Sequence, residues 1–119
     1  MKGQWINIYS GDLPLRSWWV DSGNECEYIS IVLPEVFGIN NWIRSFSEKL
    51  AAQNLPVLAI PLYGRTAPNL DLGYSEEDLK LGRHHKNLTT LKNIIEDVSA
   101  GINWVKEKYP KKKIAIIGF

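Results

Sequence analysis

Three side chains in this 119-residue sequence combine a reactive or ligand-binding group with a suggestive position. Glu35 comes two residues after a short apolar run at residues 28–33, and a carboxylate there could hold or accept a proton. Arg65 and Arg83 carry guanidinium groups, which bind carboxylates through two parallel hydrogen bonds. Both arginines lie in or near the long loop at residues 63–86, on the side of the predicted sheet where Glu35 is expected.

The other residues that could take part in metal or thiol chemistry are His84, His85 and Cys26, and their spacing matches no known site. His84 and His85 are adjacent, so their side chains diverge, and no second pair of ligands is spaced to complete a zinc site. We expect a solvated or capping role for both. Cys26 is the single cysteine, which excludes an internal disulfide and a cysteine-based zinc site, and we interpret it as structural. The sequence predicts no metal site.

Composition narrows the class of protein. Hydrophobic residues make up 45% of the chain and charged residues 23%, which is ordinary for a single globular domain and excludes a disordered or coiled-coil protein. Fourteen Lys+Arg against thirteen Asp+Glu leave a net charge of +1, so no overall field attracts nucleic acid or an anionic membrane. With neither a signal peptide nor an apolar run of membrane-spanning length, we expect a cytoplasmic protein.

The hydrophobic pattern predicts strands first. Apolar and polar residues alternate in residues 4–10, and a second β-rich run at 15–20 follows the turn at Gly11-Asp12, which predicts an antiparallel hairpin. Residues 28–33, 57–62 and 114–118 are short, almost continuously apolar runs. Such runs are typical of parallel strands that are buried on both faces.

Two helices are predicted between these strands. The first begins with Asn40 or Asn41 as its cap and ends near Asn54. The second, at residues 88–109, has one apolar seam, made by Leu88, Leu91, Ile95, Val98, Ile102 and Val105. Gly101 interrupts this seam, and we expect close packing of the helix on the sheet to compensate. Residues 63–86 look irregular, with one or two short turns that start at Ser75 and stop at Gly82.

The order of elements is a hairpin followed by strand–helix–strand–helix–strand, which predicts an α/β protein with a parallel sheet and crossover helices. The chain ends on a strand, which a finished domain rarely leaves uncovered. We therefore expect residues 1–119 to be a single incomplete domain. Gly118-Phe119 matches the first two positions of the Gly-x-nucleophile-x-Gly elbow, so the nucleophile is expected directly after Phe119.

From about residue 28 to 119 the sequence resembles the dienelactone hydrolase family. The resemblance is carried by Leu-Pro-Glu-Val-Phe-Gly-Ile-Asn at 33–40, Pro-Leu-Tyr-Gly-Arg at 61–65, the helix at 88–109 and the final strand with Gly-Phe. It implies the N-terminal part of an α/β-hydrolase fold, and an enzyme that cleaves a lactone or small ester without metal or organic cofactor. The nucleophile, usually Cys, and its Asp and His partners would all lie beyond residue 119.

The resemblance also implies roles for residues that are present. Glu35 matches the family's glutamate that hydrogen-bonds the resting nucleophile, and the N–H of Val36 matches the first donor of its oxyanion hole. The family's carboxylate-binding arginine has no direct counterpart, and Arg83 is the nearest arginine, with Arg65 as a second candidate. The expected partner is a small ester or lactone, with neither nucleic acid nor membrane. Self-association through the last strand is a further expectation.

Two other functions are compatible with the pattern. The last strand and Gly118 could open a Gly-x-Gly-x-x-Gly turn of a nucleotide-binding enzyme, although that turn normally follows the first strand of its unit. Alternatively, the 119 residues could form a non-catalytic module that covers its last strand by oligomerising. The residue after Phe119 would discriminate, because Cys or Ser favours the hydrolase and Gly favours the nucleotide-binding enzyme.

Overall fold

The computed structural model describes residues 2–119 and contains one five-stranded mixed sheet. Its strands are β1 (Gln4–Ser10), β2 (Leu13–Val20), β3 (Tyr28–Leu33), β4 (Val57–Ala59) and β5 (Lys113–Gly118), in the order β1-β2-β4-β3-β5. The hairpin β1–β2 is antiparallel, β2 continues antiparallel to β4, and β3 pairs in parallel with β4 and β5. The predicted hairpin and parallel strands are confirmed.

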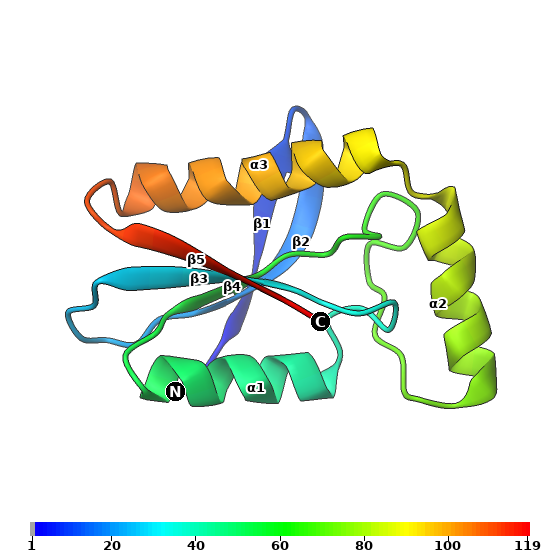
Figure 1. Cartoon of the computed structure of the whole chain (residues 1–119), viewed down its shortest axis with the longest axis horizontal. Coiled ribbons are helices and arrows are strands. Elements are labelled where there is room, and N and C mark those ends of the chain that lie inside the picture. Colours follow the sequence, from blue (N-terminus) through cyan, green and yellow to red (C-terminus); the bar gives the residue numbers. More distant parts are fainter. Residues whose placement is uncertain (1) are drawn as a thin grey trace.

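Helices cover both faces of the sheet. They are α1 (Asn41–Ala52), α2 (Glu76–Leu88) and α3 (Leu91–Lys108). Figure 1 shows α3 along one face and α1 along the other, while α2 lies at one end of the molecule, beside the loops that follow β3 and β4. No helix within residues 2–119 combines the length and the apolar character needed to cross a bilayer.

The two-sided core explains why β3 is apolar at almost every position. Ile29 and Ile31 belong to the buried cluster that includes Val105 of α3, whereas Val32 belongs to a second cluster with Ile43 of α1. Side chains of successive strand residues point to opposite faces, so a strand covered on both sides must be apolar throughout. Helix α1 begins where predicted, because the Asn40 side chain accepts a hydrogen bond from the Ile43 N–H at 3.1 Å.

The strand predicted at residues 57–62 is shorter in the structure and ends at Ala59. Ile60 and Pro61 remain buried, but Pro61 has no N–H to offer to a sheet ladder. The chain then turns, and the Gly64 N–H bonds the Pro61 carbonyl at 3.1 Å. This turn leads the chain out of the sheet toward α2.

The prediction of irregular turns for residues 63–86 is wrong at its C-terminal end. Ser75 does cap a helix, but α2 runs for 13 residues and Gly82 lies inside it rather than ending it. The apolar pattern missed the helix because α2 buries only Gly82 among its residues. Acidic residues in its first turn and His85 and Lys86 in its last turn complement the helix dipole instead.

The helix predicted at residues 88–109 is also shorter. Leu88 ends α2, and Thr90 caps α3 by accepting a hydrogen bond from the Asn93 N–H at 3.1 Å. The first half of the expected seam is exposed, since Leu91 and Ile95 are 73% and 56% accessible. Only the half from Val98 onward contacts the core. The close approach expected at Gly101 is confirmed, because a Cβ there would lie 3.3 Å from the Ile60 Cγ2.

Strand β5 leaves one edge of the sheet open, which leads to a first testable prediction. It pairs only with β3 among the described strands, and Ile116 is 50% exposed on it. We expect residues 1–119, produced alone at high micromolar concentration, to self-associate through this edge, because an unpaired ladder with apolar side chains templates pairing. Ile116→Lys should reduce the association measured by light scattering. A monodisperse monomer of the unmodified chain would contradict the prediction.

Candidate active site

The candidate site lies at the carboxyl ends of β3 and β5. The parallel register pairs Leu33 with Gly118, and the Phe119 N–H donates to the Leu33 carbonyl at 3.1 Å. Glu35 is half-buried two residues beyond Leu33. Phe119 therefore lies beside the start of the segment that carries Glu35. Ligand sites of α/β sheets collect at this edge, because loops from neighbouring strands converge there.

Backbone contacts hold the turn that carries Glu35. The Gly38 N–H bonds the Glu35 carbonyl at 3.1 Å, and the Leu72 N–H bonds the Phe37 carbonyl at 2.9 Å. Gly38 has a φ of 80°, and a Cβ on it would overlap the Leu70 carbonyl. Only glycine fits this position. The segment at residues 70–72 therefore fixes the turn from one side.

The Val36 peptide lies at the centre of this turn. Within residues 2–119 the Val36 N–H has no hydrogen-bond acceptor. On its carbonyl side, Val36 contacts Gly82 of α2 so closely that a Cβ on Gly82 would overlap the Val36 oxygen. A backbone donor without a partner, held by neighbouring elements, could bind an oxyanion.

A surface depression of about 500 Å³ adjoins the turn on the α1 side. Its walls are Asn40, Asn41, Trp42, Ser45, Asp71, Leu72, Gly73 and Tyr74. The Asn40 amide donates to the Leu72 carbonyl at 3.0 Å and to the Tyr74 hydroxyl at 3.2 Å, and the Tyr74 ring meets the Phe37 ring edge-on. Neither Glu35 nor Val36 lines this depression, although its walls support the turn that carries both.

The structure places Arg65 in a network of carboxylates rather than in an open position. Its Nη2 lies 2.9 Å from both the Asp97 Oδ1 and the Glu96 Oε2 on α3, and its Nε lies 3.3 Å from the Asp97 Oδ2. The side chain of Asp97 is 1% exposed, so this is a largely buried ion pair. The hydrogen bond to Asp97 raises the pKa of Arg65 further. These contacts support a structural role for Arg65, and its binding of substrate stays a prediction.

Arg83 is exposed on α2, directly after Gly82, and forms no ion pair within residues 2–119. Its guanidinium group therefore remains available to a ligand. His85 is partly buried, and its Nδ1 lies 2.9 Å from the Thr66 hydroxyl. This contact ties α2 to the loop after β4. Within residues 2–119 no three His, Cys, Asp or Glu side chains come together around one point as metal ligands would.

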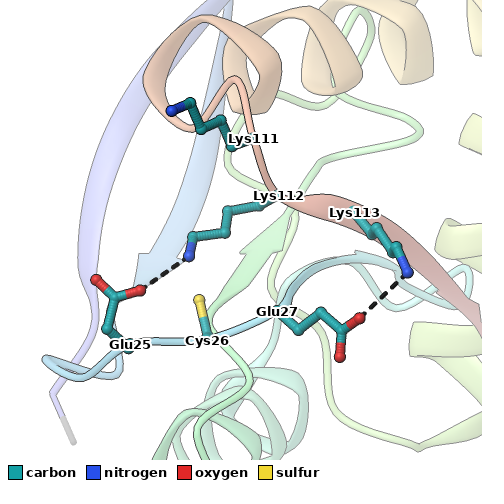
Figure 2. A pocket seen from close by; sticks show the side chains of 6 residues that line it. All are labelled: Glu25, Cys26, Glu27, Lys111, Lys112 and Lys113. Atoms are coloured by element: carbon teal, nitrogen blue, oxygen red, sulfur yellow. Dashed lines mark hydrogen bonds and ion pairs between the residues drawn. The ribbon is translucent and has the colours of Figure 1, made fainter.

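A second cavity, of about 470 Å³, lies at the opposite end of β3 and β5 (Figure 2). It is lined by Glu25, Cys26, Glu27, Lys111, Lys112 and Lys113. Figure 2 shows ion pairs on its walls, and the distances are 3.0 Å for Lys112 with Glu25 and 3.1 Å for Lys113 with Glu27. Cys26 packs against the apolar cluster beneath α3, which supports its structural interpretation. This cavity is at the amino ends of the strands and is separate from Glu35.

Comparison with known proteins places this fold in a class. A crystal structure of a protein provisionally named dienelactone hydrolase, from Klebsiella pneumoniae, superposes with a TM-score of 0.80 at 20% identity, over 98% of this chain and 49% of that one. An alpha-beta serine hydrolase homologue from Coxiella burnetii gives a TM-score of 0.67 at 17% identity, over 100% and 52%. The chain has the N-terminal part of an α/β-hydrolase fold.

Sequence comparison identifies the family within this class. The profile of the dienelactone hydrolase family matches residues 23–119. A protein of Synechocystis sp. that carries the provisional name carboxymethylenebutenolidase is 31% identical over 93 residues, which are 76% of this chain and 38% of that protein. The chain belongs to the dienelactone hydrolase family, and it spans about half the length, or less, of these relatives.

Proposed function

We propose that the protein containing this chain is a hydrolase that cleaves a carboxylic ester or lactone with a nucleophile–Asp–His triad. Family membership supports the reaction class, and the pairing of β3 with β5 supports the location of the active site. The Leu33–Gly118 register supports it, because the same pairing continued by two residues would bring the residue after Phe119 beside Glu35. The proposed nucleophile, Cys or Ser, occupies that position, and its Asp and His partners come from later segments that the longer relatives contain.

In the proposed reaction, the half-buried Glu35 carboxylate accepts a hydrogen bond from the resting nucleophile and takes its proton when substrate binds. The nucleophile attacks the carbonyl carbon, and the new oxyanion accepts a hydrogen bond from the Val36 N–H. Collapse of the tetrahedral intermediate breaks the C–O bond and leaves an acyl-enzyme, while the alkoxide takes a proton from the triad His and becomes the alcohol. In the second half of the reaction the His takes a proton from water and Glu35 returns its proton to the nucleophile. Water then hydrolyses the acyl-enzyme, so ester and water give acid and alcohol, and no cofactor is consumed.

Arg83 is the arginine that we propose for substrate binding. It is exposed on α2, beside the residue that contacts Val36. A substrate that carries a second carboxylate could pair with it. We also propose that the protein acts in the cytoplasm and that its substrate is a small ester or lactone.

The test compares the whole protein with residues 1–119 alone. We expect the whole protein to hydrolyse p-nitrophenyl acetate, and Cys26→Ala to hydrolyse it equally well, because Cys26 lies at the far end of the strands. Residues 1–119 alone should give no turnover above buffer, since they supply no nucleophile–base pair at the site. Turnover by residues 1–119, or none by the whole protein, would contradict the proposal.

The two alternatives predict different measurements. A nucleotide-binding enzyme would gain thermal stability from ATP or NAD⁺, since a ligand that binds only the folded state stabilises it. A non-catalytic module would not hydrolyse esters, and its Cys26→Ala variant would react neither with a fluorophosphonate nor with iodoacetamide, since that variant removes the free thiol at the far end of the strands. Family membership favours the hydrolase over both alternatives.

A further inference from the structure

Gly82 occupies an unusual position for a glycine. It lies in the middle of α2, where glycine is less favourable than alanine because of the backbone freedom it loses. It is also the buried residue of a helix whose other residues are at least partly exposed. Glycine at such a position is explained if a side chain would not fit there.

The obstacle is the Val36 peptide. A Cβ built on Gly82 would overlap the Val36 carbonyl oxygen and would lie 3.0 Å from both the carbonyl carbon and the Val36 Cγ2. Backbone atoms cannot swing aside as the end of a long side chain can. A methyl group at this position would therefore displace the Val36 peptide, α2 or both.

The backbone of Val36 is held on both sides, because its N–H and its carbonyl belong to two different peptide groups. The carbonyls on either side, of Glu35 and Phe37, are fixed by hydrogen bonds from Gly38 and Leu72. The Val36 carbonyl accepts no hydrogen bond from residues 2–119, so van der Waals contact with Gly82 is what limits its position. The Val36 N–H shares its peptide group with the Glu35 carbonyl, which the Gly38 N–H holds, and it has no acceptor within residues 2–119.

We infer that Gly82 is a positioning residue: by limiting where the Val36 carbonyl and Cγ2 can lie, it fixes the place of residue Val36, so that the N–H of the same residue reaches the developing oxyanion. This inference rests on the proposed function, because it gives Val36 the role of oxyanion donor. Helix α2 is itself held in place, since His85 bonds Thr66 at 2.9 Å and the neighbouring Arg65 is paired with Asp97. Because α2 is held in this way, its contact at Gly82 limits how far the Val36 carbonyl can move.

The test is Gly82→Ala in the whole protein, assayed with p-nitrophenyl acetate. Losing one oxyanion donor costs about 10²–10³ in kcat, and a displaced donor retains part of its effect, so we expect kcat to fall by about 10–100-fold. KM should change by less than about threefold, because the ground-state ester does not need the donor. An unchanged kcat, or a KM that rises instead, would overturn the inference.

Gly101→Ala is the matched control. It makes the same change at a buried glycine inside a helix, but its Cβ meets the Ile60 and Leu58 side chains instead of a backbone carbonyl. We expect its kcat to stay at the wild-type value. An equal loss in both variants would show a general packing effect and would overturn the role of Gly82.

Two further measurements keep the inference testable. If Gly82→Ala does not fold, Thr66→Val is the second variant. It keeps Gly82 but loosens α2, because it removes the hydrogen bond to His85. An unchanged kcat in Thr66→Val would overturn the inference.

If the wild-type protein hydrolyses no ester, the proposed function fails separately. The NMR chemical shifts of the backbone amides then test the inference. Gly82→Ala should shift the amide resonances of Val36 and Phe37, and Gly101→Ala should not. Unshifted resonances in Gly82→Ala would overturn the inference.

Discussion

Glu35→Gln should lower kcat/KM of the whole protein by about 10²–10⁴-fold, the usual contribution of a positioned acid–base group. Glutamine keeps the size of the side chain and leaves the Val36 N–H in place, but it cannot accept the proton of the nucleophile. Because Glu35 is half-buried and forms no ion pair within residues 2–119, its loss should change the unfolding temperature little. Steady-state kinetics across pH 6–8 would measure the effect.

Glu27→Gln is the control for this variant. It makes the same chemical change, but at the amino end of β3, where Glu27 pairs with Lys113 at 3.1 Å on an exposed surface. Its activity should equal that of the wild type. Near-wild-type turnover by Glu35→Gln would mean that Glu35 is only a loop carboxylate, and the assigned site would be wrong.

Arg65→Ala should lower the free energy of unfolding by about 2–4 kcal/mol, because it leaves the buried Asp97 carboxylate without its partner. This range is set below that of a fully buried pair, since the Arg65 side chain is 28% exposed and water can reach part of the gap. Urea unfolding of the whole protein would measure the change. The additional variant Asp97→Leu should restore part of the loss, because it removes the unpaired charge.

Arg83→Ala is the matched control for stability. Arg83 is exposed and unpaired within residues 2–119, so its loss should change stability by less than about 0.5 kcal/mol. The kinetics of Arg65→Ala test its role directly. If Arg65 has a structural role, the KM of the folded Arg65→Ala variant stays near the wild-type value. A strong rise in KM without loss of stability would show that Arg65 binds substrate.

The strands and their alternation could be predicted from the sequence, because they follow from local patterns. Residues 28–33 are apolar throughout, and the structure shows why, since α1 and α3 cover the two faces of β3. A cap at Asn40 or Asn41 is predicted because a short polar side chain before an apolar stripe satisfies the first free N–H groups of a helix, and the structure selects Asn40. For these elements, the spacing of hydrophobic residues along the chain shows directly which faces are buried.

Helix α2 could not be predicted in this way. It buries a single glycine, so it has no apolar stripe, and Gly82 suggested a stop instead of a contact. The exposed Leu91 and Ile95 show the opposite error, because an apolar seam does not say what covers it. Periodicity describes a helix face, but only the assembled fold decides which part of that face meets another element.

For the candidate site, the sequence by itself determined which residues bear chemistry and that Glu35 and Gly118 both end parallel strands. The strand register, the contact of Gly82 with Val36 and the pairing of Arg65 with Asp97 were decided by the tertiary structure. These three features join residues that are 32 or more positions apart. Such contacts depend on how the sheet orders its strands and where the loops return, which no local pattern encodes.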